Sequence, residues 1–391
     1  MKLEEVLEII KRNTSHFFPE GEFIEKYQNY LKTGKPIRIK YGADPSKPDL
    51  HLGHYVSLKK LRDLQEIGFE VVIIIGDFTA TIGDPTGRSK TRPRLSREEV
   101  MQNAKTYINQ LSKVLDINKI SVRYNSEWLS KLSAYDIVEL SSKYTISRML
   151  EREDFKNRIN SNEPLFIHEV LYPLFQAYDS VYIDADIEVG GEDQLFNFTL
   201  TREIQKQYGK EPQVVLTLPL LIGTDGKLKM SKSYNNYIAF NDEPFDMFGK
   251  IMSIGDNLIL DYYKLVLYEY NQELENFVNE NPRVAKEELA YRIVKIFHGE
   301  EIASKVREEF NKVFKYKEIP EDTQVYQLMQ EEKLSDILIK TSLVSSKNEC
   351  RRLLSQNAIK IDNKVVNQDI VINKSVFVRI GKHRFLKIVK L

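Results

Sequence analysis

Two histidines lie three residues apart in the segment PDLHLGHYVSLKKL (48–61), where an amphipathic helix is predicted to begin. The first free N–H groups of a helix and the positive end of its dipole bind anions. His51 and His54 would add directional donors to phosphate oxygens, and Gly53 would leave room for a ribose or a base against the backbone. The pattern therefore predicts a pocket for a nucleoside triphosphate.

Two other interpretations of this segment stay open on these residues alone. A surface helix can carry two ordinary histidines, and an isolated H-x-G-H pattern is compatible with that. A metal site is the other interpretation, but His51, His54 and Asp49 would need further ligands. The sequence offers no matching histidine or cysteine cluster for it.

A lysine-containing segment, KMSKS at 229–233, follows a turn with glycines at 223 and 226. Two lysines in a mobile, glycine-flanked loop can close over the β- and γ-phosphates and neutralise the charge that develops on leaving pyrophosphate. Alone, such a loop is usually a solvent-facing feature. Combined with H-x-G-H about 175 residues earlier, it favours the nucleotide interpretation.

A third group of polar residues lies on an otherwise apolar helix. Tyr172, Gln176 and Asp179 are spaced i, i+4 and i+7 and so share one helix face. Polar groups on an apolar face cost free energy unless they are paired, which predicts that they line a pocket. The alternative is a helix edge exposed to water.

Alternating strand and helix patterns surround these residues. Residues 36–43 read as a strand, 54–68 as a helix closed by Gly68, and 69–77 as a buried strand, which together make a βαβ unit. Further strands are predicted at 119–125 and 214–222. The alternation predicts a parallel sheet with helices on both faces, and ligands in such sheets bind beyond the carboxyl ends of the strands.

The pattern changes after this region. From 244 to 325 it is helical, and a linker is predicted at IPEDTQ around Pro320. The tail then shows a helix at 334–341, a second helix opened by Ser346, and two hairpins. The predicted hairpin turns are at Asp362-Asn363 and Gly381-Lys382.

Composition limits the function classes. The 391 residues predict two or three domains, and no apolar run approaches the roughly 18 residues that a membrane span needs. The start, MKLEEVLEIIKRN, resembles neither a signal nor a transit peptide, so export is not expected. A single cysteine, Cys350, excludes a disulfide framework and suits a reducing cytosol.

The net charge of zero conceals a basic tail. Residues 333–391 carry 13 Lys/Arg and 4 Asp/Glu, a net charge of +9, against −9 for the rest of the chain. Such a segment attracts phosphate polymers through counterion release, although charge alone is also compatible with a solvated surface. A phosphate-reading surface for structured RNA is predicted from four residues: Lys347, Arg351, Arg352 and Lys360.

HLGH and KMSKS resemble the two signature motifs of class I aminoacyl-tRNA synthetases, and the whole chain resembles the bacterial tyrosyl-tRNA synthetase family. The intact KMSKS and the segment DPSKPDLHLGH are closer to one of its two bacterial subtypes. The resemblance implies an α/β fold with a Rossmann-like parallel-sheet catalytic domain (1–240). It also implies an α-helical, anticodon-binding domain (241–325) and a small α+β RNA-binding domain (333–391).

The resemblance also implies the reaction. L-tyrosine and ATP would give tyrosyl-adenylate and pyrophosphate, and tyrosine would then pass to the 3′ end of tRNA(Tyr). ATP would be a substrate, with Mg²⁺ carried by its phosphates, and no permanent cofactor or protein-bound metal is implied. The family is dimeric, so a homodimer is the expectation, in the cytoplasm and without a membrane partner.

Residue roles are carried over position by position. Catalysis is assigned to His51, His54, Lys229 and Lys232. ATP binding is assigned to Asp44, Ser46, His51, Gly53, His54, Gly191, Asp193, Lys229, Ser231 and Lys232. Tyrosine binding is assigned to Asp84, Asn125, Tyr172, Gln176, Asp179 and Gln194.

One departure from the family concerns the phenol of the substrate. Where the other bacterial subtype has a tyrosine four residues before the Asp-Pro, this chain has Lys40, followed by Tyr41. The resemblance assigns Asp179 as the acceptor of the phenol hydrogen. The second partner of the phenol is therefore open.

Three competing functions remain on the sequence. A tryptophanyl enzyme would have no phenol to meet Asp179 and resembles this chain less in the tail. A small-molecule nucleotidylyltransferase also uses H-x-G-H but has no evident use for a basic tail. A synthetase-like RNA-binding scaffold without catalysis could lose His51, His54, Lys229 or Lys232, and all four are present.

Overall fold

The computed structural model describes residues 1–86, 95–314, 323–362, 364–381 and 384–390. These residues form two compact units. The first contains residues 1–243 and 250–299, and the second contains residues 244–249 and 300–391.

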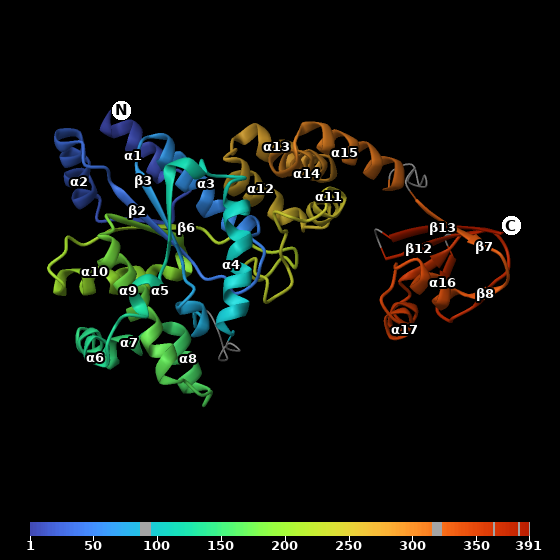
Figure 1. Ribbon diagram of the computed structural model, residues 1–391. Coiled ribbons are helices and arrows are strands. Elements are labelled where there is room, and N and C mark those ends of the chain that lie inside the picture. The colour runs from blue at the N-terminus through green and yellow to red at the C-terminus, as the bar shows by residue number, and fades with distance from the viewer. Residues whose placement is uncertain (87–94, 315–322, 363, 382–383, 391) are drawn as a thin grey trace. The chain divides into compact units, whose positions relative to one another are not determined.

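A six-stranded sheet forms the centre of the first unit, with strand order β1-β6-β5-β2-β3-β4 (Figure 1). All neighbouring strands are parallel except the edge pair β1–β6. The strands are β1 (His16–Phe18), β2 (Arg38–Ala43), β3 (Glu70–Ile75), β4 (Ile120–Tyr124), β5 (Ile187–Gly191) and β6 (Val214–Leu218).

The predicted parallel sheet is confirmed, and its strands follow from their sequences. β3 reads EVVIII and β6 reads VVLTL, and nearly every residue of both is buried, as expected for strands covered on two faces. The antiparallel strand β1 was not predicted. Three residues, HFF, are too few to show a strand period.

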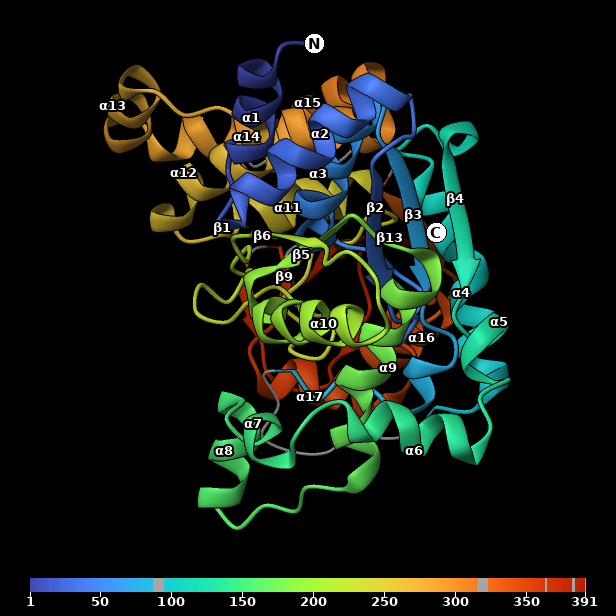
Figure 2. The same ribbon diagram turned by 90° about the vertical axis from the view of Figure 1, so that its left-hand side faces the viewer.

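Helices cover both faces of this sheet. Figures 1 and 2 show α2 and α3 on one side and α9 and α10 on the other. The helices of the first unit are α1 (Leu3–Lys11), α2 (Glu20–Thr33), α3 (Leu52–Glu66), α4 (Arg97–Leu111), α5 (Ser126–Leu129), α6 (Ala134–Ser142), α7 (Ile146–Met149), α8 (Glu153–Asn160), α9 (Ile167–Ile183), α10 (Leu195–Gln207), α12 (Ile259–Tyr262), α13 (Gln272–Glu280) and α14 (Pro282–His298). Short turns are η1 (Thr79–Thr81), η2 (Ile117–Lys119), η3 (Glu192–Gln194), η4 (Asp256–Leu258) and the π-helical η5 (Tyr263–Leu267). A further helix, α11 (Pro244–Met252), contributes to both units.

Local signals account for the helix that carries the histidines and for its successor. α3 begins at Leu52, and Gly68 follows its end with φ of +94°, a left-handed conformation that glycine adopts without strain. α4 begins after Ser96, whose side chain accepts from Glu99 N while Glu99 accepts from Ser96 N. The predicted capping box is confirmed.

The second unit combines helices with a small sheet. Its sheet has the order β10-β9-β12-β13-β7, and β8 pairs with β11. The strands are β7 (Gln324–Leu328), β8 (Glu332–Lys333), β9 (Ile359–Ile361), β10 (Lys364–Val366), β11 (Val371–Ile372), β12 (Val376–Ile380) and β13 (Arg384–Lys390). The helices are α15 (Glu300–Phe314), α16 (Leu334–Lys340) and α17 (Lys347–Ser355).

Both predicted hairpins are confirmed, as antiparallel pairs β9–β10 and β12–β13. The turn residues Asp362 and Gly381 have positive φ, while Asn363 and Lys382 lie outside the described residues. The predicted linker also lies partly outside them, at 319–322, and Gln324 already belongs to β7.

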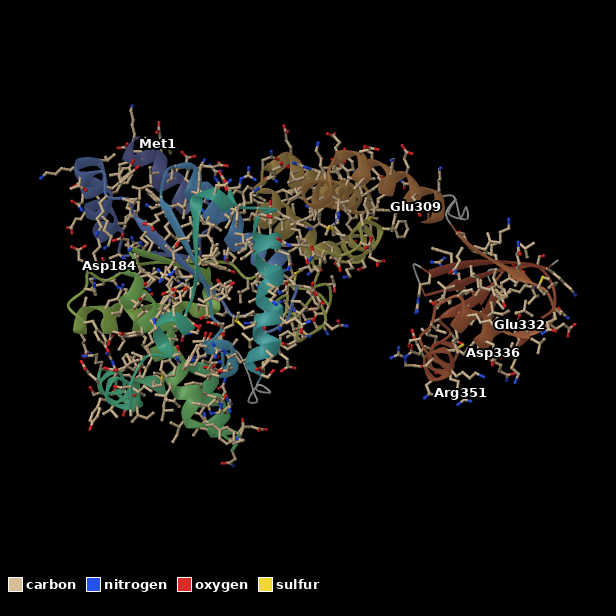
Figure 3. All side chains as sticks on the ribbon, viewed as in Figure 1. Met1, Asp184, Glu309, Glu332, Asp336 and Arg351 are labelled. Atoms are coloured by element: carbon tan, nitrogen blue, oxygen red, sulfur yellow. The ribbon has the colours of Figure 1, made fainter. Side chains whose placement is uncertain are left out.

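α17 presents a basic face. It buries Cys350, Leu353 and Leu354, whereas Arg351 and Arg352 are exposed (Figure 3 labels Arg351). Apolar residues at this helical spacing hold one face against the core of the second unit, so the intervening positions carry the charge outward.

Candidate active site

One cavity of about 720 Å³ lies in the first unit at the carboxyl ends of β2, β5 and β6, beside the first turn of α3. Every residue predicted for ATP or tyrosine lines it: Asp44, Ser46, His51, Gly53, His54, Asp84, Asn125, Tyr172, Gln176, Asp179, Gly191, Asp193, Gln194, Lys229, Ser231 and Lys232. Ligands of open parallel sheets bind at this edge. The role of each residue toward a ligand stays a prediction.

The start of α3 is held in place by backbone contacts. Leu52 N donates to Ile238 O at 3.0 Å, and His51 N donates to His54 Nδ1 at 3.2 Å. A neutral imidazole that accepts at Nδ1 carries its proton on Nε2. His54 therefore has Nε2–H as its donor.

Both histidines of this turn are neutral at pH 7. Burial lowers the pKa of His51 well below its usual value, and the neighbouring His54 and Lys232 lower it further. Burial also lowers the pKa of His54 to about 3, with Lys232 as the next cause. The two imidazoles can therefore serve an anion as N–H donors but not as cations.

Gly53 lies where the helix start meets the lysine loop. A Cβ at this position would lie 3.0 Å from two ring atoms of His51 and 3.5 Å from Cβ of Met230. Met230 belongs to KMSKS. The first turn of α3 and the lysine loop therefore pack closely in the first unit.

Lys232 reaches across to the residues that follow β2. Its Nζ donates to Lys47 O at 2.9 Å and to Tyr107 Oη at 3.2 Å, and Lys47 Nζ donates to Lys232 O at 3.1 Å. Only 7% of Lys232 is exposed. These contacts keep Lys232 and His54 on the same cavity.

Lys229 forms an ion pair with Asp193, which lies on η3 just after β5. A Cβ at Gly191 would lie 2.6 Å from Asp193 Oδ1 and 2.8 Å from Leu220 Cδ2. Any side chain at residue 191 would therefore displace the Asp193 carboxylate, and glycine avoids this. The carboxylate predicted for the ribose and a lysine predicted for the phosphates are thus direct neighbours.

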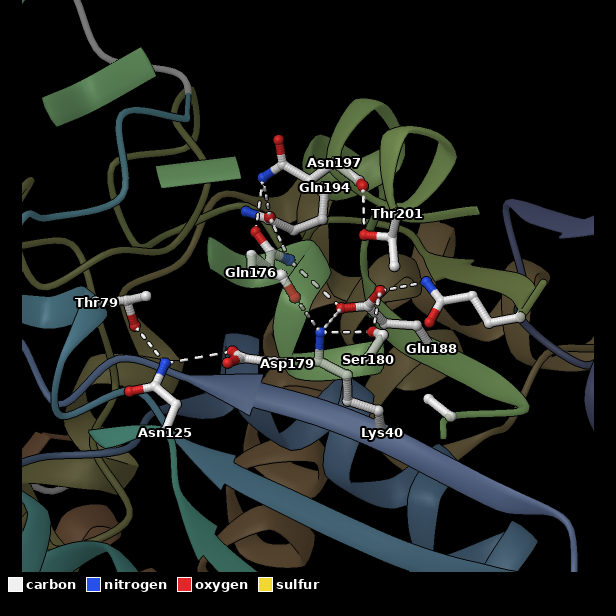
Figure 4. Close-up of polar contacts among 12 residues, drawn as sticks. Lys40, Thr79, Asn125, Gln176, Asp179, Ser180, Glu188, Gln194, Asn197 and Thr201 are labelled. Carbon is white, nitrogen blue, oxygen red and sulfur yellow. Dashed lines mark hydrogen bonds and ion pairs between the residues drawn. The ribbon is translucent and has the colours of Figure 1, made fainter. Parts of the chain in front are cut away.

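Asp179 lines the cavity, and Figure 4 shows its contact with Asn125. It is only 4% exposed; its Oδ1 accepts from Trp128 Nε1 at 2.8 Å and its Oδ2 from Asn125 Nδ2 at 3.2 Å. Buried carboxylates need such donors, because an unpaired one costs several kcal/mol. The polar residues of this helix face therefore line a pocket and are not an edge exposed to water.

The pKa of Asp179 lies near neutrality. Burial raises it to about 7, while the Lys40 ammonium and the hydrogen bonds from Trp128 and Asn125 lower it, and Glu188 raises it slightly. A carboxyl group with this pKa changes charge within the physiological range.

Side-chain amides orient the next part of the pocket. Asn197 Nδ2 donates to Gln176 Oε1 at 2.9 Å and to Gln194 Oε1 at 2.8 Å. Gln194 Nε2 then donates to Asp84 Oδ2 at 3.0 Å. This chain connects α10, α9 and the loop at residue 84 and sets which end of each amide faces the cavity.

Asp44 connects the end of β2 to α9. Its Oδ2 accepts from Tyr172 Oη at 3.0 Å and its Oδ1 from Thr79 Oγ1 at 2.7 Å. Two carboxylates, Asp44 and Asp84, and the Tyr172 hydroxyl thus line the cavity together. Such a group of acceptors suits an ammonium ion.

Sequence reasoning missed several residues that organise these groups. The main ones are Thr79, Tyr107, Trp128, Glu188 and Asn197. Trp128 had a usable signal, because it is the only tryptophan and follows Asn125 by one helical turn in RYNSEW. The others are ordinary residue types whose partners are distant in sequence.

The four residues predicted to contact tRNA lie in the second unit. Lys347, Arg351 and Arg352 are on α17 and Lys360 is on β9, and all four are exposed. Among the described residues, no group of three histidine, cysteine or acidic side chains is placed to hold a metal ion. No helix in the described part of the chain has both the length and the apolarity to cross a bilayer.

The neutral state of His54 predicts a loss of stability in acid. Its pKa in the folded protein, about 3, is below the ordinary 6.5, so below pH 6.5 the unfolded chain binds a proton that the folded protein does not. The contribution of the neutral His54 to the free energy of unfolding is therefore present at pH 7 and is lost as the pH falls toward 3. Between pH 7 and 5.5, the loss in unfolding free energy from this group is about 1 kcal/mol.

We therefore expect His54→Gln to lose about 1 kcal/mol less than the wild type over that pH interval. Urea unfolding followed by the fluorescence of the single tryptophan, Trp128, measures this in the first unit. Parallel pH dependence of wild type and variant would contradict a buried neutral imidazole at residue 54.

Comparison with known proteins shows the family of the chain. The family model described as tRNA synthetases class I (W and Y) matches residues 32–315. The tyrosine–tRNA ligase of Thermotoga maritima is 48% identical over 398 residues, covering 99% of this chain and 98% of that protein. The corresponding enzyme of Aquifex aeolicus is 51% identical over 396 residues, covering 100% of both.

A solved structure agrees as well. The tyrosyl-tRNA synthetase from Archaeoglobus fulgidus, complexed with L-tyrosine, has a TM-score of 0.64 and 26% identity and covers 78% of this chain and 100% of its own. The family model matches more than half of the residues, and two tyrosine–tRNA ligases are 48% and 51% identical to the chain over nearly its whole length. The chain therefore belongs to the tyrosine–tRNA ligase family of class I tRNA synthetases.

Proposed function

We propose that the chain activates L-tyrosine with ATP and then transfers the tyrosyl group to the 3′ end of tRNA(Tyr). The observation that carries the proposal is the convergence of HLGH, KMSKS and the Asp179 pocket on one cavity. ATP is a substrate here, its Mg²⁺ arrives on the phosphates, and no permanent cofactor takes part.

In the first step a carboxylate oxygen of tyrosine attacks the α-phosphorus of ATP. The bond from that phosphorus to the bridging oxygen breaks, and pyrophosphate leaves with the electron pair. The attacking carboxylate is already ionised at pH 7, so no general base is needed. Catalysis then rests on position and charge: Lys229 and Lys232 neutralise the leaving pyrophosphate, and His51 and His54 donate N–H groups to phosphate oxygens.

The pocket selects tyrosine by hydrogen bonding. Asp84, Tyr172 and Gln176 take the ammonium end, and Asp179 accepts the hydrogen of the phenol. Asp44, assigned from the sequence to ATP, accepts from the Tyr172 hydroxyl and so adds a negative charge beside the ammonium end. Phenylalanine would leave the buried Asp179 without that donor, and an unmet buried acceptor costs more than a missing contact. Tryptophan offers no phenol at this position.

In the second step a hydroxyl of the terminal ribose attacks the carbonyl carbon of the adenylate, and AMP leaves. We assign RNA contacts to the helical segment 241–325, as the anticodon-binding part, and to the basic segment 333–391. The four exposed basic residues of α17 and β9 support the second assignment. The single thiol, Cys350, is buried and free, which fits a reducing cytoplasm.

Pyrophosphate exchange with a panel of the standard amino acids tests the proposal. Tyrosine should support exchange with ATP far better than any other amino acid, and tRNA should not be required. Exchange driven by tryptophan instead would assign the chain as a tryptophanyl enzyme, the other kind that the family model describes. No exchange with any amino acid would favour a scaffold without catalysis.

We also propose a homodimer. Consecutive helices of the first unit expose large apolar side chains, among them Tyr135 and Val138 on α6 and Ile167 on α9. Such side chains on a monomer mark a contact surface, and a second copy is the commonest occupant. Light scattering should give the mass of a dimer, and Val138→Glu with Ile167→Glu should shift it to a monomer. A monomeric wild type would contradict the proposal.

A further inference from the structure

A buried ion pair lines the cavity beside the residues predicted to bind tyrosine. Lys40 of β2 and Glu188 of β5 are paired across neighbouring parallel strands, so both side chains project from the same face of the sheet. Lys40 Nζ lies 2.8 Å from Glu188 Oε1, and each side chain is 1% exposed.

The pair is tied to the turn of α9 that carries the selecting residues (Figure 4). Lys40 Nζ also donates to Gln176 O and to Ser180 Oγ, both at 2.8 Å. Gln176 and Ser180 are one helical turn apart, and Asp179 lies on that same turn. Lys40 therefore fastens this turn to the sheet through two hydrogen bonds.

Glu188 has its own partners. Its Oε2 accepts from Gln213 Nε2 and lies 3.5 Å from Ser180 Oγ, while its Oε1 is 3.4 Å from Gln176 Nε2. The carboxylate thus has the Lys40 ammonium on one side and amide donors on others. A fully satisfied buried pair is rigid, whereas a half-satisfied one is costly.

Stability alone is a weak reason for such a pair. Removing two charges from water costs several kcal/mol per ion, and well-packed apolar residues of similar volume usually stabilise a core at least as well. The position of this pair in the lining of the cavity suggests a different role.

The surroundings of Asp179 show what that role can be. The charged groups that face it are Lys40 from β2 and Glu188 from β5, and the neutral donors are Trp128 from α5 and Asn125 just before it. Among these groups the Lys40 ammonium lowers the pKa of Asp179 most, whereas Glu188 raises that pKa by a smaller amount.

We infer that Lys40 and Glu188 are positioning residues that set amino-acid specificity: their ion pair and the hydrogen bonds of Lys40 fix the α9 turn that bears Gln176 and Asp179. The inference rests on the proposed function for its substrate. It also answers the open question about residue 40: the ammonium is directed at α9 and Glu188 and acts on the phenol through Asp179.

Three variants separate this role from a structural one. Lys40→Met keeps the apolar stem and removes the cation, Glu188→Gln removes the anion, and the double variant removes both while leaving no unpaired buried charge. At pH 7 we expect Lys40→Met to lower kcat/KM for tyrosine about tenfold and the ratio of tyrosine to phenylalanine kcat/KM about tenfold. The KM for ATP should stay within about twofold.

The pH profile is the readout that a structural role would not move. For the wild type, kcat/KM for tyrosine should rise with pH through about 7 as Asp179 ionises. The midpoint should move up in Lys40→Met, move down in Glu188→Gln, and move up by a smaller amount in the double variant. A double variant that folds and keeps the wild-type midpoint and discrimination would overturn the inference.

A second measurement does not depend on activity. Trp128 donates to Asp179, so its fluorescence should titrate with that carboxyl group in the free protein, with the same order of midpoints. Asp179→Asn should abolish the titration and is the matched control. If the wild type fails to activate tyrosine, the proposed function fails, and the Trp128 titration still decides whether Lys40 and Glu188 control the charge of Asp179.

Discussion

Lys232→Ala is expected to lower the rate of tyrosine-dependent pyrophosphate exchange by about 10²–10³-fold, the usual loss when one preorganised donor to a developing charge is removed. The KM for tyrosine should change by less than about threefold, because Lys232 lies beside the α3 turn and the Tyr107 hydroxyl, away from the Asp179 pocket. Charge builds on pyrophosphate only as the bond to the α-phosphorus breaks. An interaction that grows at that stage affects the rate of the step more than substrate binding.

The measurement is pyrophosphate exchange at saturating tyrosine and ATP, with active-site titration of adenylate to count functional protein. Lys227→Ala is the matched control, since Lys227 is exposed in the same loop but does not line the cavity. Unchanged turnover in the Lys232 variant would refute its assignment. A rise in tyrosine KM as large as the loss of rate would indicate a disturbed pocket instead.

Removing the basic C-terminal segment is expected to lower kcat/KM for tRNA by about a hundredfold and to leave pyrophosphate exchange within about twofold. Release of counterions from four phosphates accounts for roughly that factor at 0.15 M salt. The deletion should begin at residue 323, before β7, because β7 pairs with β13 and a cut at 333 would leave its apolar residues exposed. The cavity lies wholly in the first unit, so adenylate formation has no need of this segment.

Charge reversal tests the same surface without deletion. Arg351→Glu with Arg352→Glu should weaken tRNA binding and flatten its dependence on salt, since each lost phosphate contact lowers the slope by about one. Lys374→Glu is the control, because Lys374 is exposed in the same sequence segment but lies outside the predicted surface. Equal loss of both reaction steps after the deletion would count against this division of labour.

The parts of the fold that sequence reasoning found are those specified locally. Gly68 after α3 and the capping box at Ser96 each depend on a few consecutive residues, and both are present in the structure. The strand β1 was not predicted, because its pairing with β6 depends on residues about 200 positions away. Pairing over that distance leaves no periodic signal in a three-residue segment.

The candidate site shows the same limit. Residue types and spacing pointed to His51, His54 and Asp179, because these motifs carry recognisable chemistry. The charge states of these side chains could not be predicted from the sequence. The neutral imidazoles and the elevated Asp179 pKa come from burial and from neighbours on other elements. Lys40 was noticed only as a departure from the family and Glu188 was not noticed at all, because only the order β5-β2 in the sheet makes them partners.

The small sheet of the second unit also has a consequence for biosynthesis. β13 lies between β12 and β7; β12 also pairs with β9, whereas β7 has residues 384–390 as its neighbour in this sheet. A ribosome must therefore have added Lys390, and the exit tunnel must have released it, before β7 is paired along its whole length. A nascent chain that stalls ten residues earlier would carry all residues of the first unit but an unfinished sheet in the second unit. Premature termination would thus disrupt the proposed RNA-binding segment while the cavity proposed for amino-acid activation is still formed.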